Sequence, residues 1–166
     1  GMARVMGASV DIEDVHAAID MARAVKLPAE KKVLHVVPQD YIIDGRNGIT
    51  RPLGVAGVRL ETHAHVVLGT LPRLEALELC CQLAKLTVID VVLSSLAQAE
   101  VLLTPQARDM GVILVDIGAD TTDLSVFEGG SVVHSGGIAL GGDHMTQDVK
   151  DCLNTPTVEA EHLKQV

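Results

Sequence analysis

The first part of the chain alternates between helix-like and strand-like patterns of apolar and polar positions. Between Asp11 and Val25 apolar residues recur every three or four positions, and Asp11 is of a type that caps helix N-termini. This stretch predicts an amphipathic helix that stops at Leu27-Pro28. Between Val58 and Leu68 apolar and polar residues alternate, which predicts a strand with one buried and one wet face. The expected wet face carries Arg59, Glu61, His63 and His65.

Shorter apolar runs extend this unit. Residues 33–37 and 41–43 predict two short strands separated at Pro38, followed by a turn over Asp44–Gly48. Thr70 and Pro72 are suited to begin a second helix.

The second helix has leucines on one broad face, so we expect it to pack on the sheet. Cys80 and Cys81 lie in this helix and are interpreted as small apolar core residues, since no C-x-x-C pair is present and nothing near Cys80 supplies a base. Residues 88–93 predict one more short strand.

The second half begins with a predicted helix from Ser94 to Leu103 and a polar link over residues 104–110. A continuous apolar strand, 112–115, then leads into a turn rich in Gly, Asp and Thr. Three features follow the turn: a second strand to Phe127, a Gly129-Gly130 hairpin with a third strand over 131–135, and a helix over about 143–153.

Composition narrows the function classes. A length of 166 residues with 48% hydrophobic residues is typical of a globular protein with one substantial core or two small ones. The net charge of -9 argues against nucleic acid and anionic membranes as partners. No apolar run approaches the roughly 20 residues that cross a bilayer, and the N-terminus does not resemble a secretory signal, so we expect a soluble cytoplasmic domain. Gly1 and Met2 resemble the remnant of an expression tag and are left out of the predicted fold.

The turn after the apolar strand carries the clearest candidate chemistry. Asp116 stands at the strand end and can hold a water bound to Mg²⁺, an ion that keeps several waters and takes few carboxylates. Gly118 allows close approach of the backbone to a ligand, and Thr121 and Thr122 offer hydroxyl donors to phosphate oxygens. A hairpin whose Asp and Thr residues only stabilise a tight turn explains the bare pattern equally well.

The sequence around this turn favours the phosphate interpretation. An apolar strand precedes the turn, and about 20 residues later Gly141-Gly142-Asp143 opens a helix, whose N-terminus is a place where anions bind. His144, in the first turn of that helix, is interpreted as part of its cap.

Two other groups have a plain explanation beside a functional one. His63 and His65 share a strand face at a spacing that can bind metal, but an exposed polar face explains them without a ligand. Glu13, Asp14, Asp20 and Arg23 are expected on the wet side of the first helix, as a solvated face or as an interaction surface.

Several segments in collinear order resemble the FtsA family of bacterial cell-division proteins, which are membrane-tethered actin homologues. They are His35–Gly45, Gly54–Glu61, Asp116–Asp123, Leu140–His144, Asn154–Pro156 and Ala160-Glu161. The resemblance implies an α+β fold: an SHS2-type module of strands plus two helices, followed by part of an actin-like, ribonuclease H-like ATPase subdomain. Residues 3–93 would form the interaction subdomain called 1C, residues 94–110 a connecting helix and linker, and residues 111–166 a partial subdomain 2A with the second phosphate loop.

The resemblance also implies a function. The full-length family binds ATP with Mg²⁺, self-assembles into an actin-like polymer, and tethers the ring of the tubulin homologue FtsZ to the inner face of the membrane at the septum. The nucleotide contacts would fall on Asp116, Gly118, Ala119, Asp120, Thr121, Thr122, Gly141 and Gly142, with Asp116 reaching Mg²⁺ through water. The family's first phosphate loop and adenosine motif have no counterpart in these residues, so we expect this chain to be no enzyme, to bind no cofactor, and to contact divisome proteins through its 1C-like module.

One residue departs from the family pattern, and two other families remain as alternatives. Many relatives carry Gly-Gly-Gly or Gly-Ala-Gly where this chain has Gly118-Ala119-Asp120, so the Asp120 carboxylate must point away from phosphate, bind the metal, or weaken nucleotide affinity. A sugar-kinase or phosphatase of the same superfamily would need a catalytic base and a first phosphate loop. A pilus-assembly actin relative would share the second loop, but the segments 35–45 and 54–61 favour the division family.

Overall fold

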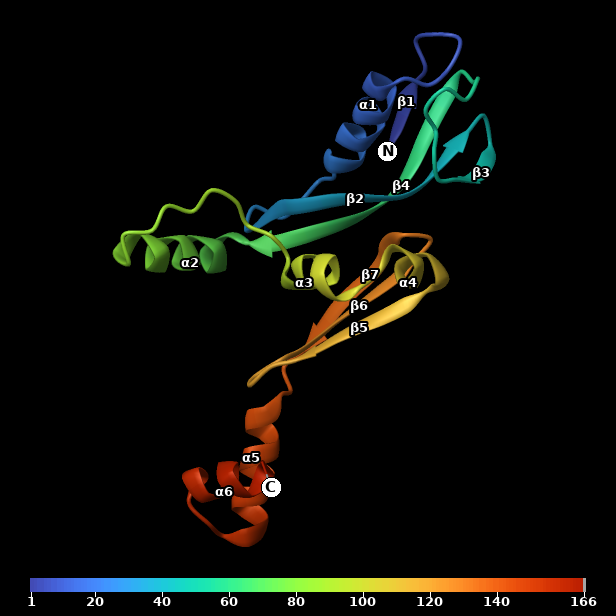
Figure 1. The fold of residues 1–166 in the computed structure, drawn as a ribbon. Coiled ribbons are helices and arrows are strands. Elements are labelled where there is room, and N and C mark those ends of the chain that lie inside the picture. Colours follow the sequence, from blue (N-terminus) through green and yellow to red (C-terminus); the bar gives the residue numbers. More distant parts are fainter. Residues whose placement is uncertain (166) are drawn as a thin grey trace.

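The structure is a computed structural model that describes residues 1–165, so Val166, the last residue of the predicted second domain, lies outside the described residues. The chain runs from a four-stranded sheet with a helix packed on it at one end to a helical hairpin at the other (Figure 1). The order of elements is β1 (Met2–Arg4), α1 (Ile12–Arg23), β2 (Lys31–Ile43), β3 (Arg46–Ile49), β4 (Arg59–Thr70), α2 (Leu71–Leu83), α3 (Ser94–Leu102), α4 (Pro105–Met110), β5 (Val112–Ile117), β6 (Thr122–Glu128), β7 (Ser131–Ile138), α5 (Gly142–Leu153) and α6 (Thr157–Lys164).

The first module is an antiparallel sheet in the order β1-β4-β2-β3 with α1 packed against it. The predicted N-cap is confirmed: the Asp11 side chain accepts from Asp14 N, and the Asp14 side chain accepts from Asp11 N, which completes a capping box. The helix ends at Arg23, before the predicted stop at Pro28. Its buried face closes a small aliphatic core with Tyr41 as its one aromatic member; the core residues are Val5, Val10, Val15, Ala18, Tyr41, Ile43 and Leu60.

Two predictions about this module's N-terminal part are wrong. Met2 belongs to the fold, because it opens β1 and pairs with Glu61, and the amino group of Gly1 donates to the Thr62 carbonyl at 2.8 Å. Asp14 is not on the wet face: it is only 4% exposed, because its carboxylate turns inward to accept from the amides of Met6 and Asp11.

Pro38 does not interrupt the sheet, contrary to the prediction of two short strands. β2 runs through it as one strand, and Pro38 pairs with Ala64 of β4. β3 pairs with β2 only over Tyr41–Ile43, so the missing N–H of Pro38 removes no bond to β3. The pairing instead shifts by one residue right after the proline, and Gln39 becomes the extra residue of a β-bulge.

The alternation predicted for β4 holds only in its first half. Leu60 and Thr62 are buried as expected, but Leu68 is 41% exposed while its neighbour Val67 is buried. A second register shift in β2, between Val33 and His35, lies opposite this point and changes which residues face inward.

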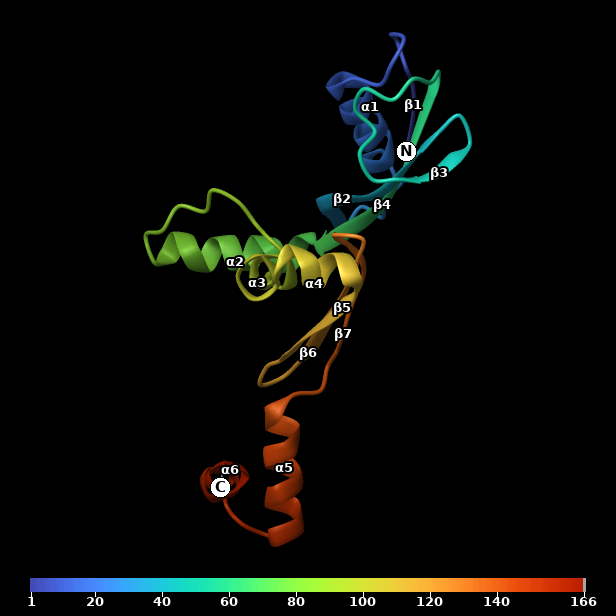
Figure 2. The same cartoon turned by 45° about the vertical axis from the view of Figure 1, so that its right-hand side comes forward.

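The second helix does not pack on the sheet as predicted. α2 has no buried residue and extends away from both modules (Figures 1 and 2). Cys80 is therefore exposed rather than a core residue, and Cys81 is half-buried. The strand predicted for residues 88–93 is absent as well, since this segment is irregular and Ile89 is 97% exposed.

The second module is an antiparallel sheet in the order β5-β6-β7, with α3 lying over β5 and β6. Gly129 and Gly130, both with positive φ, form the predicted two-residue hairpin between β6 and β7. On the face covered by α3, Ser125 Oγ donates to Ser95 Oγ at 2.7 Å beside a core of Ala99, Phe127 and Val132. The opposite face of β5 is open, because Ile113, Val115 and Ile117 are each more than half exposed.

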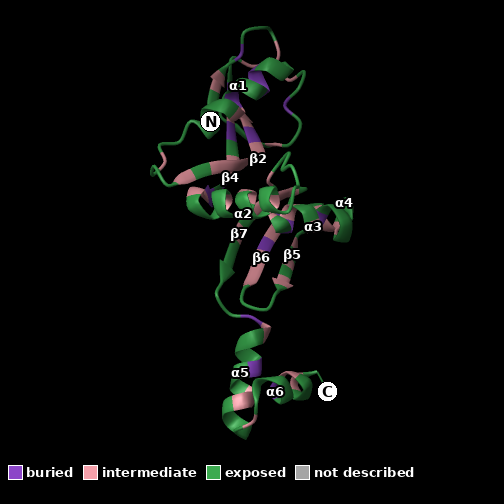
Figure 3. Cartoon of the chain, turned by 90° about the vertical axis from the view of Figure 1, so that its left-hand side faces the viewer, coloured by how far each residue is buried: buried purple, intermediate pink, exposed green. Residues whose placement is uncertain are grey.

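Three further helices follow or join this sheet. The predicted polar link contains the short helix α4, which Thr104 caps by accepting from Ala107 N at 3.2 Å. The predicted helix at 143–153 is confirmed as α5, and α6 packs against it as an unpredicted partner. The buried residues accordingly lie in three separate places along the chain (Figure 3). Among residues 1–165, none of the helices has both the length and the apolar character that a membrane-spanning segment needs.

Asp14 offers a direct test of the α1 cap. Asp14→Ala removes the carboxylate that satisfies the Met6 and Asp11 amides, so we expect a loss of about 1–3 kcal/mol in the free energy of unfolding measured with urea. The matched control is Glu13→Ala, which removes an exposed acid from the same helical turn and should change stability by less than about 0.5 kcal/mol. Equal effects of the two substitutions would contradict this account of the cap.

Candidate functional site

The predicted phosphate loop is a tight connection between β5 and β6. Gly118 N donates to the Thr121 carbonyl at 2.8 Å and closes the turn. Gly118, Ala119, Asp120 and Thr121 are all exposed, so the crest of the loop is open to solvent. A ligand could therefore reach this backbone from outside.

The start of α5 is seated directly on this loop. Gly142 N donates to the Gly118 carbonyl and Asp143 N donates to the Ala119 carbonyl, both at 2.9 Å. A Cβ on Gly141 would lie 2.3 Å from the Ala119 carbonyl oxygen, so only glycine permits this approach. The predicted glycine pair thus lies beside the loop, where its local role is to hold the loop carbonyls.

Two carboxylates stand on the sheet face below the loop. Asp116 and Asp123 are directly paired across β5 and β6, so their side chains leave the sheet on the same face, and both are half-buried. Asp116 Oδ2 accepts from Gln98 Nε2 at 2.6 Å, and Asp123 Oδ2 accepts from Thr121 Oγ1 at 3.3 Å. A pair of half-buried carboxylates fits a hydrated Mg²⁺, which needs few protein ligands. Within the described part of the chain no group of three or more His, Cys, Asp or Glu side chains is placed to hold a metal directly.

The loop hydroxyls already have acceptors within the protein. Thr121 donates to Asp123, and Thr122 Oγ1 donates to the Leu140 carbonyl at 2.7 Å. Phosphate contact through either hydroxyl would require its proton to turn away from these acceptors. The predicted roles of the eight loop and glycine-pair residues therefore stay predictions, although the structure brings all eight into one region.

Two groups next to this region were not predicted from the sequence. The first is Gln98 on α3, whose side chain orients the Asp116 carboxylate from outside the loop. The two residues are 18 positions apart in the sequence, and no pattern of spacing links them. The second group is the side chain of Lys164, which donates to the Gly142 carbonyl at 3.1 Å and to Thr146 Oγ1 at 2.8 Å. Hydrogen bonds from Lys164 and Thr146 lower the pKa of Glu161 to about 2. The i,i+3 spacing of Glu161 and Lys164 was the available signal for this cluster.

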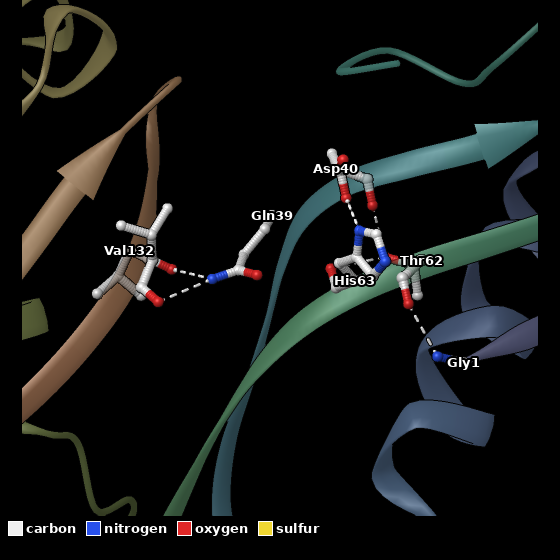
Figure 4. Close-up of polar contacts among 7 residues, drawn as sticks. Gly1, Gln39, Asp40, Thr62, His63 and Val132 are labelled. Carbon is white, nitrogen blue, oxygen red and sulfur yellow. Dashed lines mark hydrogen bonds and ion pairs between the residues drawn. The ribbon is translucent and has the colours of Figure 1, made fainter. Parts of the chain in front are cut away.

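The three histidines singled out from the sequence have defined partners. His144 Nδ1 accepts from Gly141 N at 3.1 Å, which confirms that it caps α5. His63 Nδ1 lies 2.7 Å from Asp40 Oδ1 on the neighbouring strand (Figure 4). His65 is not on an exposed face, because its Nε2 lies 2.8 Å from Ser135 Oγ of the second sheet.

Comparisons with known proteins divide the chain in the same way as the two sheets do. The family model described as the SHS2 domain inserted in FtsA matches residues 1–68, and the model of the cell-division protein FtsA matches residues 113–166. Cell division protein FtsA of Pseudomonas aeruginosa is 40% identical over 164 residues, which is 99% of this chain and 39% of that protein. The FtsA of Neisseria meningitidis is 35% identical over 99% of this chain and 40% of its own length.

The chain belongs to the FtsA family. It spans about two fifths of the length of the curated relatives it matches. A solved structure titled PilM-PilN type IV pilus biogenesis complex matches the whole chain and 47% of its own chain with a TM-score of 0.65 at 16% identity, a likeness of fold alone. The predicted α+β, actin-like architecture with an SHS2 module is confirmed, and the family likeness favours the division protein over the pilus-assembly alternative.

Gly141 tests whether the loop depends on its contact with α5. Gly141→Ala places a methyl group against two loop carbonyls, so we expect unfolding to become easier by about 1–3 kcal/mol, with faster hydrogen exchange at the Gly142 and Asp143 amides. Gly142→Ala is the matched control, because its Cβ would meet its nearest atom at 3.5 Å, an ordinary contact. If Gly141→Ala left both amides as protected as in the unsubstituted chain, the loop would not depend on this approach.

Proposed function

We propose that this chain acts in bacterial cell division as part of an FtsA-like actin homologue, with the SHS2-like module as a protein-interaction surface and the Asp116–Asp123 loop as one half of a nucleotide site. The observation that carries the proposal is the seating of the Gly118–Thr121 turn on the first turn of α5, in a chain of the FtsA family. The open crest, the paired carboxylates and the nearby helix start are the parts that a phosphate with bound Mg²⁺ requires.

In the whole protein we propose that ATP with Mg²⁺ binds across this half-site and a second half contributed by other segments. Asp116, with Asp123 opposite, would hold waters of the Mg²⁺ ion, and Gln98 would keep the Asp116 carboxylate in place. The bound ion would neutralise phosphate charge. Asp120 is exposed at the crest of the loop, where its carboxylate would face phosphate at short range and weaken binding.

The 166 residues alone offer only one wall of such a site, so we propose that the chain by itself is no enzyme. Affinity for a nucleotide depends on enclosing most of its surface, and an exposed loop on one sheet encloses little of it. The SHS2-like module, which has its own core and an exposed acidic helix face, is the part suited to contact other division proteins or a second FtsA copy. In the whole protein, self-assembly, contact with FtsZ and a place at the cytoplasmic face of the septal membrane follow from the same family membership.

Nucleotide binding by the chain alone is the first test. Calorimetric titration with ATP in the presence of MgCl₂ should give no heat or a Kd weaker than about 1 mM, because less than about 4 kcal/mol is available from one wall. A circular dichroism spectrum of the same sample should show the helix and strand signal of the folded chain, so that absence of binding is not due to unfolding. A micromolar Kd would contradict the half-site proposal.

Partner contact is the second test. A charge reversal on the exposed face of α1, Glu13→Lys with Asp20→Lys, should reduce association with full-length FtsA of Pseudomonas aeruginosa at least about tenfold in a pull-down, since like charges across an interface cost several kcal/mol. The matched control, Asp148→Lys with Asp151→Lys on exposed positions of α5, reverses the same charge outside the SHS2-like module. Unchanged association of the α1 variant, or an equal loss in both variants, would contradict the assigned surface.

A further inference from the structure

The sheet of the SHS2-like module has two unlike faces. Ala3 of β1 and Leu60 of β4 point toward α1, which Figure 1 shows on one side of these strands. Successive side chains of a strand point to opposite faces, so the neighbouring residues Arg4 and Arg59 leave the sheet on the face away from α1. Both arginines are exposed. This face therefore presents two positive charges that α1 of the same chain cannot reach.

The two arginines form a directly opposed pair of like charges. Val5 N donates to the Val58 carbonyl at 2.8 Å, so the next pair along the ladder, Arg4 with Arg59, lies at a position without backbone hydrogen bonds. Opposed side chains come closest at such positions, and like charges placed there destabilise a sheet. An anion bound between the two guanidinium groups removes this repulsion.

The arginines keep most of their hydrogen-bonding capacity free. Arg59 Nε lies 3.1 Å from Glu61 Oε1, but these side chains are 57% and 31% exposed, and an exposed ion pair contributes little. Within residues 1–165 the Arg4 guanidinium has no acceptor. Asp40, further along the same face, is already paired with His63. The pair of arginines can therefore accept an acidic group from outside.

An open hollow of about 320 Å³ adjoins the pair. Its lining is formed by Met2, Ala3, Arg4, Val58 and Arg59. Met2 is 49% and Val58 is 63% exposed, so apolar surface flanks the guanidinium groups. A guanidinium presents a planar fork of N–H donors that binds a carboxylate through two parallel hydrogen bonds. The hollow thus fits a carboxylate that stands next to an apolar side chain.

The exposed face of α1 offers this combination twice. Glu13 and Asp20 are both exposed, and they lie seven positions apart, which is about two helical turns and places them on one side of the helix. An exposed apolar residue adjoins each acid: Ile12 is 52% and Met21 is 59% exposed. Because the acids and the arginines lie on opposite faces of one module, contact between them joins two molecules.

We propose that the arginine pair, Arg4 with Arg59, binds the exposed acidic face of α1 of a second copy of this chain. The inference rests on the proposed interaction role of the SHS2-like module and identifies the surface that its acidic helix meets. The two surfaces differ, so the contact is heterologous and leaves one free surface of each kind on every pair. Further copies therefore add head to tail.

Sedimentation velocity of the whole 166-residue chain tests the contact, at about 0.15 M NaCl, where screening beyond about 8 Å suppresses repulsion between the net charges. We expect the weight-average mass to rise at least about twofold between about 10 μM and 1 mM, the range of weak association. The rise should vanish at about 1 M NaCl, where the screening length is about 3 Å. Arg4→Gln with Arg59→Gln (the arginine variant), and separately Glu13→Gln with Asp20→Asn (the acid variant), should each stay monomeric with an unchanged circular dichroism spectrum.

A mixture of the two variants tests the heterologous geometry. Each variant has lost one surface and keeps the other, so an equal mixture should form a one-to-one dimer that grows no further. Amide resonances of the labelled arginine variant should shift along α1 when the acid variant is added. Asp148→Asn with Asp151→Asn, which removes two exposed acids of α5, is the matched control and should assemble like the unsubstituted chain.

Three results would overturn the proposal: an unsubstituted chain that is monomeric at about 1 mM, an arginine variant that assembles like it, or a mixture of variants that stays monomeric. The pull-down with FtsA separates this inference from the proposed function. If charge reversal on α1 abolishes the pull-down while the arginine variant still assembles, α1 meets another surface and only this inference fails. If the mixed dimer forms while the pull-down is unaffected, only the proposed contact with FtsA fails.

Discussion

The pairing of β2 with β4 is the interaction on which the rest of the structure depends. These strands of 13 and 12 residues form one antiparallel ribbon that reaches from the core under α1 to the junction with the second sheet. The two register shifts in β2, near Leu34 and at Gln39, enclose the stretch that faces the second module. A bulge costs the ribbon one ladder position but re-aims a side chain, and here the re-aimed Gln39 provides two of the bonds between modules.

The loop between β5 and β6 is held in place by close contact between backbone segments, not by buried side chains. Its carbonyls are held by the first amides of α5, and this is possible only because Gly141 brings the helix within contact of Ala119. The loop is thus ordered by local contacts although its crest is exposed and one face of its sheet is uncovered. An ordered but open loop is compatible with the proposal that it forms one wall of a nucleotide site.

The sequence predicted features that depend on local rules and missed those that depend on tertiary context. The Asp11 cap, the Gly129-Gly130 hairpin and the order of the second sheet follow from residue type and spacing, and all three are present. The continuous β2 was missed because the tolerance of Pro38 depends on how far β3 extends beside it. The position of α2 was missed because leucines on a helix do not say what covers them, and within residues 1–165 α2 has no buried residue. The roles predicted for the loop residues from their pattern stay predictions, whereas Gln98 and Lys164 could not be found from the sequence, because only the fold brings their helices near the loop.

In an FtsA-type protein we propose that these residues form the SHS2-like module and one wall of the nucleotide site. The most direct measurement replaces the matching 39% of Pseudomonas aeruginosa FtsA with this chain and titrates the purified chimera with ATP and Mg²⁺. We expect the chimera to bind ATP with a Kd within about tenfold of that of the parent protein, because the parent protein then supplies the other wall of the site. A chimera that folds and remains soluble yet binds no ATP would contradict it.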